Sequence, residues 1–185
     1  MEISFAQLLI FITIAWIIIR GAVALKSRQF SVKRELQLLP VYVCIAVILR
    51  FVFFGFHLEN GKIPLLKVGF SSNVTDMVSY KTFTFLTERY DGWLLNIIGN
   101  MAMFIPVGIV WPICFRQINS IWKTVLAGAG YSLLIELLQL LCPERHTDLD
   151  DLILNTTGVL LGALIVFSIR KVTGKRHGKN NSKER

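Results

Sequence analysis

The sequence has few charges, few cysteines and few histidines for its length. Only 17% of the 185 residues are Asp, Glu, Lys or Arg, compared with about a quarter in soluble domains. The three cysteines, Cys44, Cys114 and Cys142, form no CxxC pair, which argues against a zinc site or thioredoxin-type chemistry. Ser132 has no histidine in its apolar run, so a serine nucleophile is unsupported. What the sequence does contain is long apolar runs.

Hydrophobic residues make up 54% of the chain, and the mean hydropathy is +0.57. A membrane-spanning helix needs roughly 20 mostly apolar residues. The sequence therefore predicts an all-α integral membrane bundle of five transmembrane helices, in one domain over residues 1–170. The first run is not a signal peptide, because its positive charges follow the run instead of preceding it. The predicted helices cover residues 3–25, 38–56, 93–115, 121–142 and 149–169.

The positive charges lie mostly at the ends of the apolar runs. The net charge is +8, yet seven of the twenty Lys and Arg residues fall in residues 170–185, a distribution that argues for membrane topology and against nucleic-acid binding. The positive-inside rule predicts an N-terminus outside and a C-terminus inside, with thirteen Lys and Arg inside and five outside. Residues 171–185 then form a basic cytoplasmic tail, predicted to be disordered. Residues 57–92 form a long outer segment of unassigned structure.

Polar side chains interrupt four of the apolar runs at similar depth. A charge at the bilayer centre costs about 2.5–3.5 kcal/mol on insertion scales, so such residues are candidates for function. Arg50 and Glu136 each lie roughly 9 Å from the outer end of their predicted helix. Their opposite charges predict an ion pair at the core of a polar site that faces the outer leaflet. The candidate binding residues are Arg50, Asn96, Asn100, Glu136, Gln139, Asp148, Asp151 and Asn155.

Helical spacing favours convergence of these residues, since positions three or four apart share a helix face. Such sets are Asn96 with Asn100, then Ser132, Glu136 and Gln139, then Asp148, Asp151, Asn155, Gly158 and Gly162. The two glycines form a GxxxG motif, which is typical of close helix packing in membranes. The alternative interpretation is that the polar groups only hold helices together. Residues His146, Asp148, Asp150 and Asp151 fit helix capping better than metal binding, so no metal or cofactor is predicted.

Two segments of the sequence resemble the signature segments of VanZ-like membrane proteins. They read NIIGNMAMFIPVGIVWP over residues 96–112 and SLLIELLQLLCPERHTDLDDLILNTTGVLLG over residues 132–162. The matching positions are Asn96, Asn100, Phe104, Pro106, Gly108, Glu136, Gln139, Asp148, Asp151, Asn155, Thr156 and Gly158. The stretch YKTFTFLTERYDGW lacks the proline that the family has before the third helix. The resemblance implies a multi-pass protein of the bacterial cytoplasmic membrane, in a family whose founding member is associated with resistance to teicoplanin.

Three functions are compatible with this sequence. The first hypothesis is a protein that binds a membrane lipid, a lipid-linked cell-wall precursor or another amphiphile and alters the sensitivity of the cell envelope. The second is an intramembrane enzyme acting on an envelope lipid, with Glu136 or Asp151 as the acid or base. The third is a small transporter or a transporter subunit, although the chain has no internal repeat of the kind that carriers use.

Overall fold

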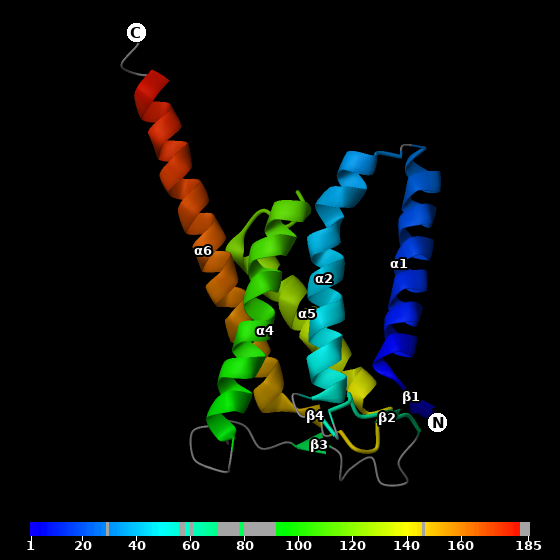
Figure 1. Ribbon diagram of the computed structural model, residues 1–185. Coiled ribbons are helices and arrows are strands. Elements are labelled where there is room, and N and C mark those ends of the chain that lie inside the picture. The colour runs from blue at the N-terminus through cyan, green and yellow to red at the C-terminus, as the bar shows by residue number, and fades with distance from the viewer. Residues whose placement is uncertain are drawn as a thin grey trace. The chain divides into compact units, whose positions relative to one another are not determined.

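The computed structural model of the chain consists almost entirely of α-helices (Figure 1). It describes residues 1–28, 30–55, 58–59, 61–69, 78–79, 92–145 and 147–181. The chain divides into two compact units. The first unit comprises Met1–Lys81 and Leu134–Leu149, and the second comprises Thr82–Leu133 and Asp150–Arg185.

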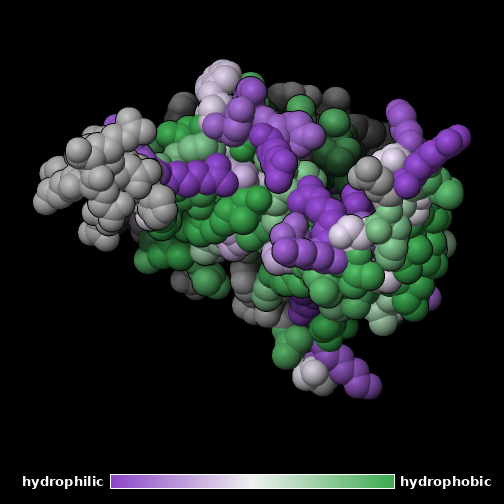
Figure 2. Space-filling view, turned by 90° about the horizontal axis from the view of Figure 1, so that it is seen from above, coloured by the Kyte–Doolittle hydropathy of each residue, from purple (hydrophilic) through white to green (hydrophobic). Residues whose placement is uncertain are grey.

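In the described part of the chain, five helices are long and apolar enough to cross a membrane. They are α1 (Phe5–Ser27), α2 (Val32–Phe54), α4 (Trp93–Cys114), α5 (Ile121–Gln139) and α6 (Leu149–Asn181). Many large apolar side chains on these helices are exposed. In Figure 2, green hydrophobic side chains cover the flanks of the helices, while purple hydrophilic ones gather at the ends that face the viewer. The predicted all-α membrane fold is therefore confirmed, whereas the N-outside orientation stays a prediction.

Helices α2 and α6 extend at least six residues beyond their predicted bounds. Helix α2 begins at Val32 instead of Leu38. Helix α6 continues past Ile169 to Asn181, so the helix includes most of the tail that was predicted to be disordered. Hydropathy marks only the part of a helix that suits the bilayer. Lys, Arg and Glu are themselves good helix formers, so a helix can continue into water beyond its apolar part.

Helix α5 is shorter than predicted and ends at Gln139. Beyond it, the N–H groups of Leu141 and Cys142 donate to the carbonyls of Leu138 and Gln139, each three residues earlier. This spacing is typical of the tightened last turn of a helix. The apolar run therefore continues past the helix into a turn.

In the first unit, α1 and α2 form an antiparallel pair (Figure 1). Near one end, the rings of Phe5 and Phe54 pack edge to face with centroids 5.7 Å apart. At the other end, the guanidinium of Arg20 donates to both carboxylate oxygens of Glu35, at 2.8 and 2.6 Å. The start of α1 contacts the end of α2 and the end of α1 contacts the start of α2, so the two helices run in opposite directions. The pair is joined by the short stretch 28–31.

Among its described residues, the first unit contains two short strand pairs. Strand β1 (Glu2–Ile3) pairs antiparallel with β2 (Leu66–Lys67), and β3 (Val78–Ser79) pairs parallel with β4 (Thr147–Asp148). Strands β2 and β3 belong to the segment 57–92, whose structure the sequence leaves unassigned. The pairing therefore ties this segment to the N-terminal end of α1 and to the stretch just before α6.

In the second unit, α4 and α6 pack in parallel at very short distance. A Cβ atom built on Gly158 would overlap the carbonyl oxygen of Met101, and one built on Gly162 would overlap that of Ile105. Only glycine leaves room for two helix backbones at this separation. The close packing predicted from the GxxxG motif is therefore confirmed, and α4 is the helix that packs against it.

Helix α5 contributes residues 121–133 to the second unit and runs antiparallel to α6. Ser132 contacts Asn155, and Gly128, one turn earlier, would place a Cβ atom 2.5 Å from a Val159 methyl group. An earlier residue of α5 thus contacts a later residue of α6, as expected for antiparallel helices. The polar residues Ser132 and Asn155 lie within this tightly packed pair.

Candidate polar site

A network of amides and a carboxylate joins α4 to the start of α6. The side-chain amide of Asn100 donates to Asp151 Oδ1 at 2.5 Å and to Asn96 Oδ1 at 3.3 Å. Asn100 is buried, and Asp151 lies in the first turn of α6, where the helix dipole favours negative charge. The predicted polar face of α4, with Asn96 and Asn100, therefore meets the predicted polar face of α6 at Asp151.

A second polar contact joins α5 to α6 one turn further along α6. Asn155 Nδ2 donates to Ser132 Oγ at 2.9 Å. Asn155 is 2% exposed and Ser132 is fully buried. Within the part of the chain that the structure describes, Asn155 Oδ1 has no hydrogen-bond partner. A buried acceptor without a donor costs about 1–3 kcal/mol, so this oxygen favours a bound donor. These residues, Asn96, Asn100, Ser132, Asp151 and Asn155, are called the polar core below.

An apolar groove runs along the same two helices, beside the Ser132–Asn155 contact. Its volume is about 560 Å³. Leu133 and Thr156 in its lining directly follow Ser132 and Asn155 in the sequence. Nothing lies within 4 Å of the position that a Cβ atom would take on Gly130, so the groove is open there. The lining residues are Leu126, Ala129, Gly130, Leu133, Leu152, Ile153, Thr156 and Thr157.

In the first unit, Glu136 ties the end of α5 to strand β4. Its carboxylate Oε2 accepts a hydrogen bond from the Asp148 N–H at 3.1 Å, and its backbone carbonyl accepts one from Thr147 Oγ1 at 2.9 Å. Glu136 is only 4% exposed. Gln139, one turn on, is also buried, and its Oε1 has no partner among the described residues. Glu136 thus holds a neighbouring loop in place.

Arg50 caps its own helix. Its Nη1 donates to the carbonyl of Gly55 at 2.7 Å, and its guanidinium lies 5.5–5.7 Å from the ring centroids of Phe5 and Phe51. Arg50 lies four residues before the end of α2 at Phe54, so the side chain reaches the terminal carbonyls. A cation there is favoured by the helix dipole.

The expected ion pair between Arg50 and Glu136 is not found. The ion pairs among the described residues are Arg20–Glu35 and Lys67–Glu144. Arg50 and Glu136 each contact backbone groups instead. The predicted depth follows from the Cα position along each helix, whereas the long side chain of Arg50 reaches the helix end.

Arg145 is a partly buried cation that the sequence did not mark as a candidate. Its Nε and Nη2 both donate to the Phe53 carbonyl, at 3.2 and 2.7 Å. Burial lowers the pKa of Arg145 from the usual arginine value. Sequence reasoning counted Arg145 only as an outer positive charge, because nothing local links it to a helix 92 residues earlier.

The structure accounts for the predicted site in two parts. In the second unit it brings Asn96, Asn100 and Asp151 together and pairs Asn155 with Ser132. In the first unit it joins Glu136 to Asp148 and places Arg50 at a helix end. Whether residues of the two units meet in one site stays a prediction. Among the described residues no group of His, Cys, Asp and Glu could hold a metal ion, and His146 lies outside them.

Comparison with known proteins finds a matching family model. No curated protein and no solved structure is similar to this chain. The model of the VanZ/LLP1 family matches residues 8–170, which cover most or all of each of the five candidate spans. The chain therefore belongs to the VanZ/LLP1 family of multi-pass membrane proteins.

Proposed function

We propose that this protein binds a membrane lipid or another amphiphile at the polar core of its second unit. Through that binding it alters the sensitivity of the cell envelope to glycopeptides such as teicoplanin. The observation that carries the proposal is the position of the groove between α5 and α6. Leu133 and Thr156, which line this apolar groove, directly follow Ser132 and Asn155 in the sequence, and Asn155 Oδ1 is a buried acceptor without a donor among the described residues.

The groove suits one acyl chain of such a ligand. Leucine, isoleucine, alanine and glycine residues line it, and the only polar residues in the lining are Thr156 and Thr157. The Thr157 hydroxyl already donates to the Ile153 carbonyl at 2.8 Å, so it presents mainly its methyl group. Both helices are membrane spans, and lipid chains are the most abundant apolar molecules at such a surface.

The polar core suits the other end of the ligand. A hydroxyl or ammonium group would supply the donor that Asn155 Oδ1 lacks. The Asp151 carboxylate, held by Asn100, adds a negative charge one helical turn earlier on α6. A charge-assisted hydrogen bond to that carboxylate would be roughly twice as strong as a neutral one. The ligand class is therefore an amphiphile with hydrogen-bond donors next to its acyl chain.

Filling the groove tests this proposal. Gly130→Leu adds a side chain where the groove is open, and Gly21→Leu is the matched control, because Gly21 also has nothing within 4 Å. Lipids that copurify with the protein are quantified by native mass spectrometry, and teicoplanin sensitivity is measured in cells expressing each variant. We expect Gly130→Leu to lower lipid retention about tenfold and to abolish any change in sensitivity, whereas Gly21→Leu retains both.

Asn155→Leu tests the polar end of the same site. It removes the acceptor and should reduce retention of ligands that carry hydroxyl or amine donors. Unchanged retention and sensitivity in both Gly130→Leu and Asn155→Leu would contradict the proposal. Conversion of an envelope lipid by the purified protein, lost in Asp151→Asn or Glu136→Gln, would favour the enzymatic alternative instead.

A further inference from the structure

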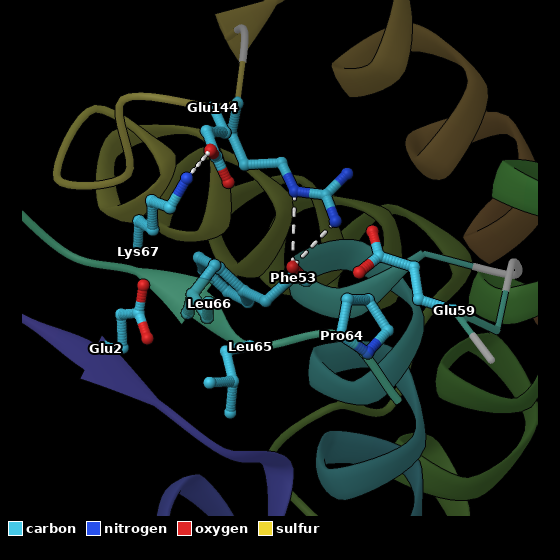
Figure 3. Close-up of a pocket in the computed structure, with 9 residues that line it drawn as sticks. Glu2, Phe53, Glu59, Pro64, Leu65, Leu66, Lys67 and Glu144 are labelled. Atoms are coloured by element: carbon cyan, nitrogen blue, oxygen red, sulfur yellow. Dashed lines mark hydrogen bonds and ion pairs between the residues drawn. The ribbon is translucent and has the colours of Figure 1, made fainter. Parts of the chain in front are cut away.

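The first unit contains a separate cavity of about 490 Å³ (Figure 3). It lies at the ends of two membrane-spanning helices. Glu2 precedes the start of α1 at Phe5, and Phe53 lies in the last turn of α2. The ends of spanning helices lie at the depth of lipid headgroups. The cavity is lined by Glu2, Phe53, Glu59, Pro64, Leu65, Leu66, Lys67, Glu144 and Arg145.

Two carboxylates of the cavity are not neutralised by a described side chain. Lys67 Nζ forms an ion pair with Glu144 Oε1 at 2.6 Å. Neither Glu2 nor Glu59 makes a side-chain hydrogen bond or ion pair with the described residues. Glu144 raises the pKa of Lys67 most, and Glu2 and Glu59 add smaller contributions in the same direction. The carboxylates of Glu144, Glu2 and Glu59 therefore all lie close enough to Lys67 to stabilise its positive charge.

A fixed cation lies in the same lining. The guanidinium of Arg145 is held by two hydrogen bonds to the Phe53 carbonyl, while its Nη1 donates to no described residue. Arginine stays charged in proteins even when burial lowers its pKa. In Figure 3, Glu2 and Glu59 lie at opposite ends of the lining, with Leu66 and Phe53 between them. The cavity thus offers a cation together with unneutralised carboxylates.

We propose that this cavity binds the headgroup of a phospholipid with a primary amine, such as phosphatidylethanolamine. The phosphate contacts Arg145, and the ammonium contacts Glu59 or Glu2. A purely cationic ligand would be repelled by Arg145, and a purely anionic headgroup would be repelled by the two carboxylates. A trimethylated amine has no N–H group to donate to a carboxylate, so phosphatidylcholine fits less well. The proposal shares no residue with the polar core and does not depend on the proposed function.

Headgroup competition tests the proposal with the full chain in nanodiscs. The bilayers contain phosphatidylethanolamine mixed with phosphatidylcholine or with phosphatidylglycerol, and native mass spectrometry measures which lipid stays bound. We expect the wild-type chain to retain the ethanolamine lipid preferentially over both others. The double variant Glu2→Gln with Glu59→Gln keeps the size of both side chains and removes their charge. It should lose about tenfold of that preference, the effect of losing charge-assisted hydrogen bonds.

Control variants separate this site from other effects. Lys26→Gln, exposed in the last turn of α1, changes charge away from the cavity and should retain the preference. Gly130→Leu should also retain it, so failure here and failure of the proposed function remain distinguishable. Because Glu2 and Glu59 are exposed, the double variant should melt like the wild type. Arg145→Lys should weaken retention of both phosphatidylethanolamine and phosphatidylcholine, because both carry the phosphate.

Two results would overturn the proposal. One is equal retention of the ethanolamine and choline lipids by the wild-type chain. The other is an unchanged preference in the double variant. Soluble glycerophosphoethanolamine that displaces the bound lipid would support recognition of the headgroup itself. Spermidine that displaces it equally well in the wild type and in Arg145→Lys would count against a role for the phosphate.

Discussion

Helices α1 and α6 are both apolar enough to cross a membrane, yet they pack very differently. No residue of α1 is buried, whereas α6 buries a continuous face that includes Leu154, Asn155, Val159 and Ala163. Small residues make the difference. Gly21 on α1 has nothing within 4 Å, whereas Gly158 and Gly162 on α6 touch the backbone of α4. Hydropathy therefore predicts which helices insert, while small residues decide which helices pack closely.

Polar side chains differ in the same way between the α1–α2 pair and the helices of the second unit. In the α1–α2 pair they lie at partly exposed positions, such as the Thr13–Tyr42 hydroxyl contact at 2.8 Å. In the second unit they are buried beneath tightly packed helices, as Asn155 is. A polar residue in an apolar run can thus support a helix pair at its margin or lie inside a packed core. The second arrangement buries the hydrogen bond between Asn155 and Ser132.

The largest predicted effect is on the close packing of α4 and α6. Gly162→Ala places a methyl group against the Ile105 carbonyl, so the two helices must separate. We expect a loss of about 3 kcal/mol in the free energy of unfolding, the upper range for overpacking. The matched substitution Gly21→Ala, at an open position, should cause no loss. Equilibrium unfolding in mixed detergent micelles measures both, and similar losses would remove the distinction between the two regions.

Much of the fold follows from the sequence because its causes are local. Five apolar runs of bilayer length predict five spans, and the GxxxG spacing of Gly158 and Gly162 predicts a close-packed face. The strand pairs could not be predicted, because two-residue strands have no periodicity to detect. The long segment 57–92 gives no sign that Leu66–Lys67 returns to the chain's first residues.

The second effect concerns the buried network of the polar core. Asn100→Leu removes the amide that binds Asp151 and leaves that carboxylate without this donor. We expect the free energy of unfolding to fall by about 1.5 kcal/mol. This is at the low end of the cost of losing a hydrogen bond to a charged group in water-soluble proteins, because such bonds stabilise membrane proteins less. A double-mutant cycle with Asp151→Leu should show positive coupling. Strict additivity of the two losses would show that this contact does not stabilise the second unit.

Helix periodicity predicts which polar residues share a helix face, and this part of the candidate site could be predicted from the sequence. Helical spacing aligns Asn96 with Asn100 and Asp151 with Asn155. The structure joins Asn100 to Asn96 and to Asp151, whereas Asn155 binds Ser132 on α5. The contact of Arg50 with the end of its own helix could not be predicted, because the depth of a Cα atom does not say where a long side chain ends. Arg145 was missed because its role depends on a loop returning to the end of α2, which is a contact between distant parts of the chain.

The third effect concerns the two arginines at the C-terminal end of α2. Arg145→Met removes both hydrogen bonds to the Phe53 carbonyl and should cost about 1 kcal/mol. Arg50→Met removes one bond to Gly55 and a favourable charge at the helix end, and should cost about 0.5 kcal/mol. Thermal unfolding of the two variants in the same detergent gives the order. If Arg50→Met were the more damaging change, Arg50 would have a role beyond capping.

The smallest effect is at the exposed ion pair of the first unit. The pair with Glu144 raises the pKa of Lys67 above 10.5, its unfolded value. A raised pKa in the folded state means that the stabilisation is fully present below pH 10.5 and is lost as the pH rises through the higher, folded value. Lys67→Gln should therefore melt like the wild type at high salt, which screens exposed charges. At low salt, any difference between the two should be constant from pH 7 to 9 and shrink above pH 10.5. A difference that grew in that alkaline range would mean that Lys67 is stabilised in its neutral form.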